Sequence, residues 1–379
     1  MNPNVFYKSL IDHEITFFTG IPDSLLKDFT DSVSSYTDNG NHIISSNEGT
    51  AIGTAIGYHL ATRRTPCVYL QNSGIGNALN PILSLADNEI YSIPMLIVLG
   101  WRGKPETKDE PQHIKQGAVM IPLLEAIGLD YQIIEDKTNE FECVRRASSK
   151  LKETNSPYVL LVSPNSFESF EKVSGDISGQ LCTREEAIKC ILSSIGKEDI
   201  VVSTTGKASR ELFELEQNTS GNYWRNFLAV GGMGHASSIA LGIALHKRNK
   251  KVYCIDGDGS VIMHMGAMVI NGSMDLIDNF VHIVINNGAH ESVGGQPTVG
   301  RKINLTKIAQ GCGYTECYSA SSLKELKRAI TLISKLRGRL FVEINVRQGS
   351  RGDLSRPKSS LKKYKMALQN FLSNETSCI

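Results

Sequence analysis

Two short polar segments, one helix and one strand apart in the second half of the chain, hold the residues best suited to chemistry. The first reads Ile255-Asp256-Gly257-Asp258-Gly259-Ser260, and the second reads Asn286-Asn287-Gly288. The glycines on either side of Asp258 predict a tight turn from a strand into a helix, whose free N–H groups can hold a diphosphate. The Asp258 carboxylate and the Asn287 amide add hard oxygen ligands of the kind that Mg2+ requires. The two segments therefore predict a site for a diphosphate with its magnesium ion.

The elements that position these segments are short apolar runs that alternate with helical patterns. The runs are apolar along their whole length, as in parallel strands that are covered on both faces. Strands are expected at 42–45, 66–70, 94–99, 158–163, 199–203, 251–256, 280–286 and 339–345. Helices are expected at 48–62, 184–195, 235–246, 260–271 and 322–336. This alternation predicts an α/β protein with parallel sheets.

The chain is expected to form two doubly wound parallel-sheet domains, because 379 residues exceed one ordinary α/β domain. The stretch after 158–163 is polar and lacks apolar periodicity, which is typical of a linker. The predicted boundaries are 1–165 for the first domain, 166–182 for the linker and 183–379 for the second domain. Thr183 and Glu186 have the spacing of a capping box and predict the start of the second domain's first helix.

The composition indicates a globular protein without a nucleic-acid or membrane partner. Hydrophobic residues make up 41% and charged residues 21%, and the net charge is +1. We find no signal-peptide pattern and no apolar run of membrane-spanning length, so a cytoplasmic location is expected. The eight cysteines lack the spacing of a zinc site and are expected to be reduced.

A second group of residues lies before the diphosphate motif. Glu48 stands at the start of the helix 48–62, where its plainest role is to stabilise the first turn. Gly49, Gly53 and Gly57 in that helix are spaced by four and predict close approach of a neighbouring helix. Met233 lies among glycines in Val230-Gly231-Gly232-Met233-Gly234, and a methionine there is more often an ordinary core residue.

The Gly-Asp-Gly turn followed by Asn-Asn resembles the diphosphate motif of thiamine-diphosphate enzymes. That resemblance implies that Asp258, Asn287 and the Ala289 carbonyl bind Mg2+, and that Gly257, Gly259 and Ser260 hold the diphosphate. It also implies that Glu48 activates the cofactor through its pyrimidine ring, which places that ring on the first domain. Gly232 and Met233 would support the bent cofactor between its two rings. Thr204, Thr205 and Gly206 end the strand 199–203 and would contact the cofactor.

Longer strings resemble phosphonopyruvate decarboxylases, a thiamine-diphosphate-dependent family close to the sulfopyruvate decarboxylases. The matching strings start at Gly20, Asn47, Gln71, Gly100, Asp109, Asn286, Gly294 and Gly349. Trp101-Arg102-Gly103 and Asp109-Glu110-Pro111-Gln112-His113 are more specific than the cofactor motif. Ser355 stands where glycine is expected, and Glu291 stands where aspartate is expected. The second departure leaves the role of its loop open.

The resemblance implies decarboxylation of 3-phosphonopyruvate to phosphonoacetaldehyde and CO2 through a cofactor ylide and enamine. Arg102 can hold an oxyanion with two N–H donors, and His113 can donate, accept or carry charge. Asp23 follows the apolar run 15–19 and could relay a proton, although its turn could equally be ordinary turn chemistry. Asn72 and Gln71 end a strand and are expected to line the same pocket. His290 and Gln296 are expected to contact the substrate from the second domain.

Three alternatives remain open from the sequence. A sulfopyruvate decarboxylase would act on the same oxoacid with a sulfonate in place of the phosphonate. A synthase that joins two oxoacids usually has a third domain, for which the linker here leaves no room. A scaffold that has lost catalysis would lack Glu48 or Asp258, and both are present. The resemblance further implies a homo-oligomer, at least a dimer, with active sites shared between subunits.

Overall fold

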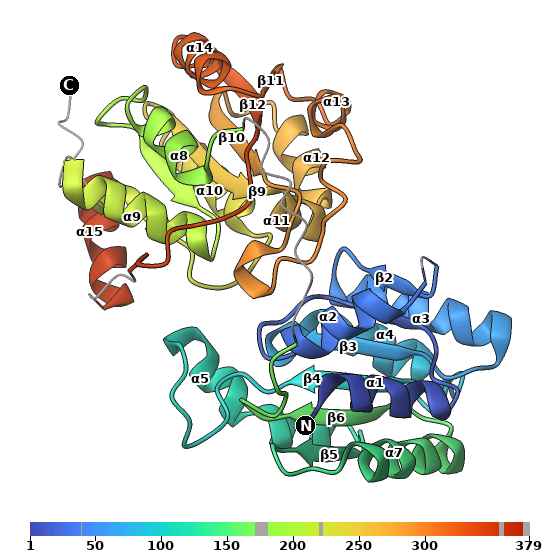
Figure 1. Ribbon diagram of the computed structural model, residues 1–379. Coiled ribbons are helices and arrows are strands. Elements are labelled where there is room, and N and C mark those ends of the chain that lie inside the picture. Colours follow the sequence, from blue (N-terminus) through green and yellow to red (C-terminus); the bar gives the residue numbers. More distant parts are fainter. Residues whose placement is uncertain (39, 171–180, 220–222, 356–359, 374–379) are drawn as a thin grey trace. The chain divides into compact units, whose positions relative to one another are not determined.

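The computed structural model describes residues 1–38, 40–170, 181–219, 223–355 and 360–373, and its backbone divides into two units (Figure 1). The N-terminal unit comprises Met1–Gly175 with Val293–Gln296, and the C-terminal unit comprises Asp176–Ser292 with Pro297–Ile379. Most of the predicted linker, residues 171–180, lies outside the described residues. Ser166 and Phe167, which were assigned to that linker, pack on the N-terminal unit: Ser166 Oγ donates to Ile134 O, and Phe167 contacts the hydrophobic core.

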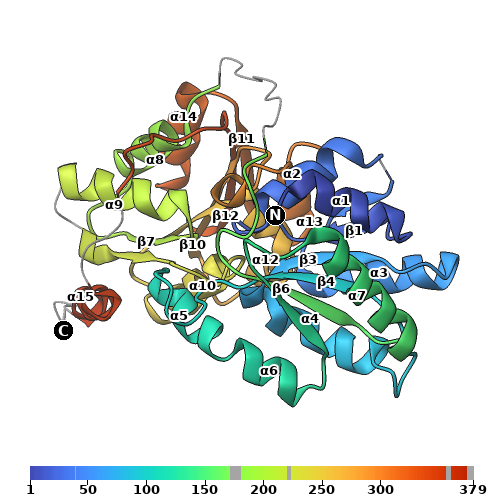
Figure 2. The same ribbon diagram turned by 60° about the horizontal axis from the view of Figure 1, so that its bottom comes forward.

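The N-terminal unit is built on a six-stranded parallel sheet of order β2-β1-β3-β4-β6-β5. Its strands are β1 Phe18–Gly20, β2 His42–Ile44, β3 Cys67–Gln71, β4 Leu96–Gly100, β5 Tyr131–Ile134 and β6 Tyr158–Val162. Its helices are α1 Pro3–Asp12, α2 Lys27–Tyr36, α3 Glu48–Thr62, α4 Ile75–Pro81, α5 Pro111–Ala118, α6 Met120–Ala126 and α7 Glu140–Thr154. The helices α1, α2 and α7 cover one face, and α3, α4 and α6 cover the other (Figure 2).

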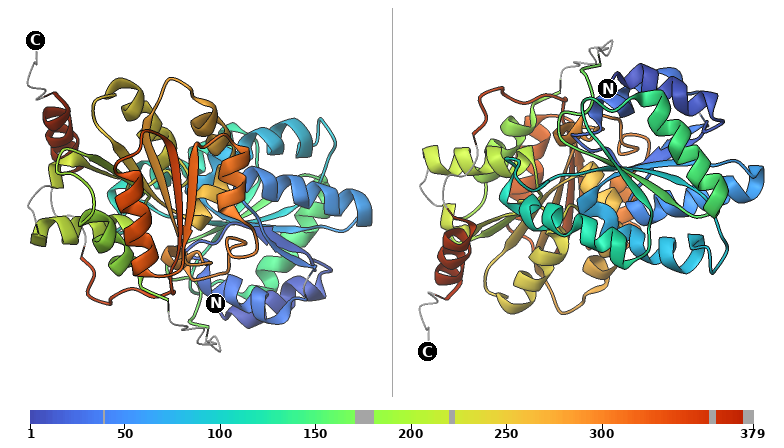
Figure 3. Two further views of the ribbon diagram at one scale, coloured as in Figure 1. Left: turned by 90° about the horizontal axis from the view of Figure 1, so that it is seen from above. Right: turned by 90° about the horizontal axis from the view of Figure 1, so that it is seen from below.

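The C-terminal unit has a second six-stranded parallel sheet, of order β11-β12-β10-β9-β7-β8. Its strands are β7 Ile200–Ser203, β8 Asn226–Leu228, β9 Val252–Gly257, β10 Asn279–Asn286, β11 Glu316–Ala320 and β12 Gly338–Asn345. Its helices are α8 Arg184–Leu192, α9 Lys207–Thr219, α10 Ala236–His246, α11 Asp258–Met263, α12 Gly266–Ser273, α13 Leu305–Gly311, α14 Leu323–Ile333 and α15 Leu361–Ser373. The helices α8, α9 and α14 pack on one face, and α10, α12 and α13 pack on the other (Figure 3).

The two sheets have the same topology, because each reads 2-1-3-4-6-5 when its strands are numbered within its own unit. The chain leaves the first strand toward one edge and returns to the third strand on the other side of it. Ligands of such sheets bind outside the carboxyl ends of the strands at this reversal. The predicted doubly wound α/β fold is confirmed for both halves.

Several local predictions are confirmed and others need correction. Thr183 and Glu186 form the capping box, with Thr183 N donating to Glu186 Oε2 at 2.8 Å and Glu186 N donating to Thr183 Oγ1 at 3.1 Å. The expected helix 260–271 is two helices, α11 and α12, because His264 leaves the helical conformation at φ −131° and ψ 51°. Among the described residues, the close approach expected at Gly49, Gly53 and Gly57 occurs at Gly49 alone, where a Cβ would lie 2.9 Å from Asn77 O.

The seven cysteines of the described segments, Cys378 lying outside them, are all free. None of the helices in the described ranges combines the length and the apolar character that crossing a membrane requires.

Candidate active site

In each unit, three of the candidate residues follow the first, third and fourth strands of the sheet. These strands are neighbours in the order 1-3-4, so their carboxyl ends lie side by side. In the N-terminal unit they lead into Asp23, Asn72 and Arg102, and in the C-terminal unit into Thr204, Asp258 and Asn287. The repeated topology therefore gathers the candidate residues of each half at one edge of its own sheet.

Glu48 lies at the first position of α3, after β2, and its carboxyl group is buried. Asn47 caps the helix by accepting from Thr50 N at 2.9 Å, which fixes where the helix begins. Glu48 Oε2 accepts from Asn77 Nδ2 at 2.8 Å. A Cβ on Gly74 would lie 2.1 Å from Glu48 Oε1, so glycine there makes room for the carboxyl group. Burial raises the pKa of Glu48, and the Asn77 hydrogen bond only partly offsets it.

Asp23 is fully buried in the turn that follows β1. Its Oδ1 accepts from Gln71 Nε2 at 2.5 Å, and its Oδ2 accepts from Leu25 N at 3.2 Å. A Cβ on Gly100 would lie 2.2 Å from Oδ2, so this carboxyl group also rests against a glycine. Burial raises the pKa of Asp23 in spite of the Gln71 hydrogen bond and the nearby charge of Arg102. The side chain is thus suited to holding a proton.

Arg102 lies two residues after β4 and is held by Asp109. Its Nε donates to Asp109 Oδ2 at 2.8 Å, its Nη2 pairs with Asp109 Oδ1, and its Nη1 donates to Ser24 Oγ at 2.6 Å. Burial opposes ionisation of Asp109, but the hydrogen bonds from Arg102, His113 and Gly103 outweigh it and hold its pKa well below the usual range. The guanidinium is therefore fixed and paired before any ligand binds.

Asp109 is the residue that joins the predicted substrate-binding side chains of this unit. It also accepts from His113 Nδ1 at 3.0 Å, one helical turn along in α5. Asn72 completes the group, since its Nδ2 donates to Arg102 O and its Oδ1 accepts from Arg102 N. Arg102, His113 and Asn72 are predicted from the sequence to bind substrate, whereas no role is predicted for Asp109. The four-residue spacing between Asp109 and His113 could have indicated it.

The C-terminal unit brings Asp258 and Asn287 together, as the sequence predicts. Asp258 is 1% exposed, and its Oδ1 accepts from Asn287 N at 3.4 Å while its Oδ2 accepts from Thr298 Oγ1. Asn287 Oδ1 accepts from Ala289 N at 3.1 Å. Burial raises the pKa of Asp258 to about 6 against the opposing hydrogen bonds from Thr298 and the backbone. A bound cation would stabilise the ionised form of such a buried carboxyl group.

The remaining predicted cofactor contacts of this unit form a polar group at the start of α11. Ser260 Oγ pairs with Thr204 Oγ1 at 2.9 Å and accepts from Gly234 N at 3.0 Å. Gly206, Gly232 and Gly234 all have positive φ, as tight loops require. Met233 and Thr205 are half-buried beside these glycines. The hydrogen bonds join two loops, those after β7 and β8, to Ser260, which follows the turn that carries Asp258.

His290 and Gln296 occupy different surroundings. A Cβ on Gly259 would lie 2.9 Å from the His290 ring, so the glycine allows this ring to pack against the turn from Gly257 to Gly259. Burial lowers the pKa of His290 to about 4, which keeps the ring neutral. Gln296 is buried in the N-terminal unit, where its Nε2 donates to Thr30 Oγ1 at 3.0 Å. Its expected contact with substrate stays a prediction.

The chemistry of the side chains in these two groups fits thiamine diphosphate and Mg2+. Asp258 supplies a carboxylate and Asn287 an amide oxygen, the donor types that Mg2+ prefers, and Asn287 N donates to Asp258 Oδ1 at 3.4 Å. A Cβ on Gly300 would lie 2.5 Å from Asp258 Oδ2, so glycine at this position leaves space for the buried carboxylate. Glu48 is a shielded carboxyl group with a raised pKa, which suits a hydrogen bond to a ring nitrogen.

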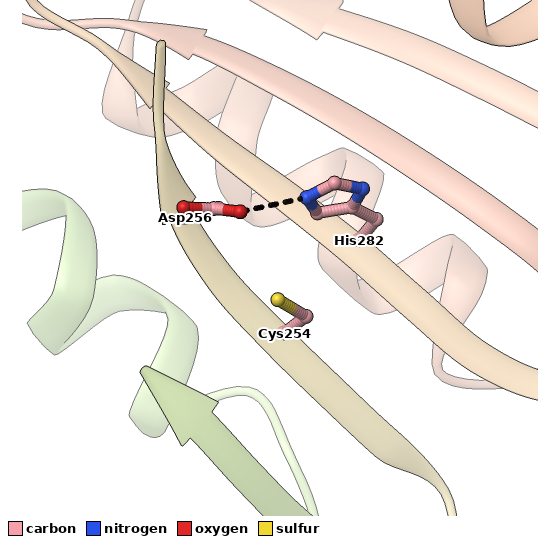
Figure 4. Close-up of side chains that lie close together, drawn as sticks. All are labelled: Cys254, Asp256 and His282. Atoms are coloured by element: carbon pink, nitrogen blue, oxygen red, sulfur yellow. Dashed lines mark hydrogen bonds and ion pairs between the residues drawn. The ribbon is translucent and has the colours of Figure 1, made fainter. Parts of the chain in front are cut away.

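Another buried polar group lies on the strands β9 and β10 of the same sheet (Figure 4). Cys254 and Asp256 of β9 and His282 of β10 place a sulfur, an oxygen and a nitrogen within 4.8 Å of one another. His282 contacts Asp256 Oδ2 at 3.4 Å and Tyr314 Oη at 3.1 Å, so both ring nitrogens have partners. Burial raises the pKa of the Cys254 thiol well above its usual range, and a thiol must lose its proton to bind a metal. We interpret these three residues as structural, holding in place the turn that follows β9.

Comparisons with known proteins agree with this arrangement. The N-terminal TPP binding domain of thiamine pyrophosphate enzymes matches residues 3–121, and the C-terminal TPP binding domain matches residues 204–344. The chain is 33% identical to a phosphonopyruvate decarboxylase of Streptomyces viridochromogenes over 91% of this chain and 88% of that protein. It is 32% identical to a phosphonopyruvate decarboxylase of Streptomyces hygroscopicus over 91% and 87%. It is 28% identical to a sulfopyruvate decarboxylase of Methanosarcina acetivorans over 83% and 84%.

Proposed function

We propose that this chain, which belongs to the phosphonopyruvate decarboxylase family of thiamine pyrophosphate enzymes, converts 3-phosphonopyruvate into phosphonoacetaldehyde and CO2. The observation that carries the proposal is the similarity to two phosphonopyruvate decarboxylases along nearly the whole chain. The buried carboxyl groups and paired oxygen ligands at the strand ends support it, because each has a defined task in such a reaction.

The C-terminal unit is proposed to anchor the cofactor. Asp258, Asn287 and the carbonyl of Ala289 would hold Mg2+, and Ser260 with the turn from Gly257 to Gly259 would hold the diphosphate. Gly232 and Met233 would support the thiamine rings, with Thr204, Thr205 and Gly206 beside them. When bound, thiamine diphosphate takes up the electron pair that is released as CO2 leaves.

The N-terminal unit is proposed to activate the cofactor and bind the substrate. Glu48 would donate a hydrogen bond to the pyrimidine ring, and its raised pKa supports this role. Arg102 and His113 would face the anionic groups of the substrate, in the orientation that Asp109 gives them. In the net reaction the bond to the carboxylate carbon breaks and one proton takes its place on the former carbonyl carbon. Asp23 is suited to supply that proton, because burial raises its pKa.

The assembly that this function needs is a homo-oligomer, at least a dimer, with each active site shared between two subunits. Its proposed location is the cytoplasm. A gel-filtration and light-scattering measurement on the full chain would test the assembly, and a monomer that is fully active would contradict it.

The second candidate is sulfopyruvate decarboxylation, which the similarity to the Methanosarcina acetivorans enzyme favours. The two substrates differ in charge, because a phosphonate can carry two negative charges and a sulfonate carries one. In the described part of the N-terminal unit, Asp109 pairs with Arg102 and offsets much of the guanidinium charge, so this pair by itself does not favour the dianion. The substrate assay therefore decides between the two candidates.

The test is a set of parallel assays with purified protein, thiamine diphosphate and Mg2+. Phosphonopyruvate, sulfopyruvate and pyruvate are offered separately while CO2 and aldehyde are measured. We expect kcat/KM to be highest for phosphonopyruvate, and a clear preference for either other oxoacid would overturn the substrate assignment. In Glu48→Gln we expect turnover to fall roughly 100-fold or more, whereas the exposed Glu89→Gln serves as a matched control and should leave turnover unchanged.

A further inference from the structure

A buried network of charged side chains surrounds the loop that carries Asn287. Glu291 lies four residues after Asn287 and accepts from Arg184 Nη1 at 2.8 Å and from Lys207 Nζ at 3.1 Å. Arg184 is in turn held by Glu211 through two hydrogen bonds, of 2.7 and 2.8 Å. The side chains of Arg184, Glu211 and Glu291 are 8%, 2% and 11% exposed, so solvent screens these charges little.

Glu291 also determines which way the Asn287 amide points. Asn287 Nδ2 donates to Glu291 Oε2 at 2.8 Å, and Asn287 Oδ1 accepts from Ala289 N at 3.1 Å. An amide NH2 can only donate and an amide oxygen can only accept, so a carboxylate on one side fixes the oxygen on the other. Only the oxygen can bind a magnesium ion. The carboxylate of Glu291 therefore selects the amide orientation that a metal ligand needs.

The same loop is joined to the segment that follows β7. Ser292 Oγ accepts from Lys207 N at 3.3 Å, and a Cβ on Gly206 would lie 2.5 Å from that hydroxyl oxygen. With the ion pair between Lys207 and Glu291, two side chains of the loop thus contact the start of α9. The loop after β10 and the segment after β7 are held together on either side of the Asp258 turn.

We propose that Glu291 is a positioning residue for the magnesium site: held by Arg184 and Lys207, it orients the Asn287 amide so that its oxygen faces the ion. The inference rests on the proposed function, since it assumes that Asn287 binds Mg2+. It also gives a role to the loop in which Glu291 replaces the expected aspartate. A glutamate is one methylene longer, which lets a single carboxylate contact Asn287, Arg184 and Lys207 together.

The first test measures metal binding without turnover. Mn2+ is titrated in place of Mg2+ into full-length protein with saturating thiamine diphosphate, and free Mn2+ is counted by electron paramagnetic resonance. Removing a hydrogen-bond partner of a metal ligand typically weakens metal binding about 10- to 100-fold, so we expect the Mn2+ Kd to rise at least about 10-fold in Glu291→Ala.

Glu216→Gln is the matched control for the loss of a buried charge. Glu216 is 1% exposed and pairs with Arg225 at 2.6 Å in the same unit. Both substitutions should lower the thermal stability of the metal-free protein, but only the change at Glu291 should weaken Mn2+ binding. An unchanged Kd in Glu291→Ala, or an equal rise in Glu216→Gln, would overturn the inference.

A second test removes the need for an oriented amide. In Asn287→Asp both side-chain oxygens are acceptors, so the ligand no longer depends on which way the group is turned. Glu291→Ala should therefore raise the Mn2+ Kd clearly less in the Asn287→Asp background than in the native protein. An equal rise in both backgrounds would contradict the orienting role. If the native protein takes up neither Mn2+ nor thiamine diphosphate, the proposed function itself fails; native binding with an unaffected Glu291→Ala defeats only this inference.

Discussion

Asp109→Asn removes the charge that holds Arg102 and His113 while preserving the size of the side chain. The five donors to Asp109 are divided between its two oxygens: Arg102 Nε and Gly103 N face Oδ2, and Arg102 Nη2, Glu110 N and His113 Nδ1 face Oδ1. An asparagine has one oxygen, so in either orientation its NH2 group faces at least two donors. The substitution must therefore break at least two hydrogen bonds to a charged acceptor.

The magnitude follows from the number and burial of these bonds. A hydrogen bond to a charged group contributes about 1.5–3 kcal/mol, and breaking a buried ion pair costs about 3–5 kcal/mol. The side chains of Asp109 and Arg102 are 7% and 18% exposed, so the lower end of these ranges applies. We expect the free energy of unfolding to fall by roughly 3 kcal/mol in Asp109→Asn.

The assay is urea unfolding followed by fluorescence, together with steady-state kinetics on phosphonopyruvate. KM should rise more than kcat falls, because the loosened Arg102 would weaken substrate binding before it affects chemistry. Glu142→Gln is the matched control, since Arg145 contacts Glu142 in the same two-bond geometry at an exposed position, and it should change neither quantity measurably. Equal unfolding midpoints and slopes for Asp109→Asn and the parent protein would refute the reasoning.

Three further predictions concern other parts of the structure. In Gly74→Ala the new Cβ would lie 2.1 Å from Glu48 Oε1, so we expect turnover to fall at least about 10-fold. Gly76→Ala is the control and should leave turnover unchanged, because its Cβ would meet no described atom within 4 Å. Burial lowers the pKa of His42 from 6.5 to about 4, so the unfolded state binds more protons than the folded state between these two pH values. The contribution of neutral His42 to the free energy of unfolding should therefore be complete above pH 6.5 and should fall by about 3 kcal/mol at most toward pH 4. His42→Gln should lessen this fall. Chelation of Mg2+ in the presence of thiamine diphosphate should abolish decarboxylation and lower Tm. Adding Mg2+ back at about 100 times its Kd should restore about 2.7 kcal/mol to the free energy of unfolding. A Tm that does not respond to Mg2+ would contradict the proposed metal site.

The sequence by itself determined the features that depend on neighbouring residues. Long apolar runs predict central strands such as β10, the helix that begins at Glu48 is present, and the Gly-Asp-Gly turn leads from β9 into α11 at Asp258. These features are local, because a buried parallel strand needs an unbroken apolar run and a tight turn needs its glycines. The short strands β1 and β8 and the half-exposed edge strands β5 and β11 were missed, since three residues or a partly polar run carry too little pattern.

Only the tertiary structure decided how the site residues are held. Asp109 and Glu291 stand in ordinary polar stretches of the sequence, yet one joins Arg102 to His113 and the other joins Asn287 to Arg184 and Lys207. The pairing of Glu291 with Arg184 spans 107 residues, so only the folded chain brings these two side chains into contact. Residue types and spacing thus identify groups that can react, whereas hydrogen bonds between distant segments fix the orientation and the protonation in which those groups can act.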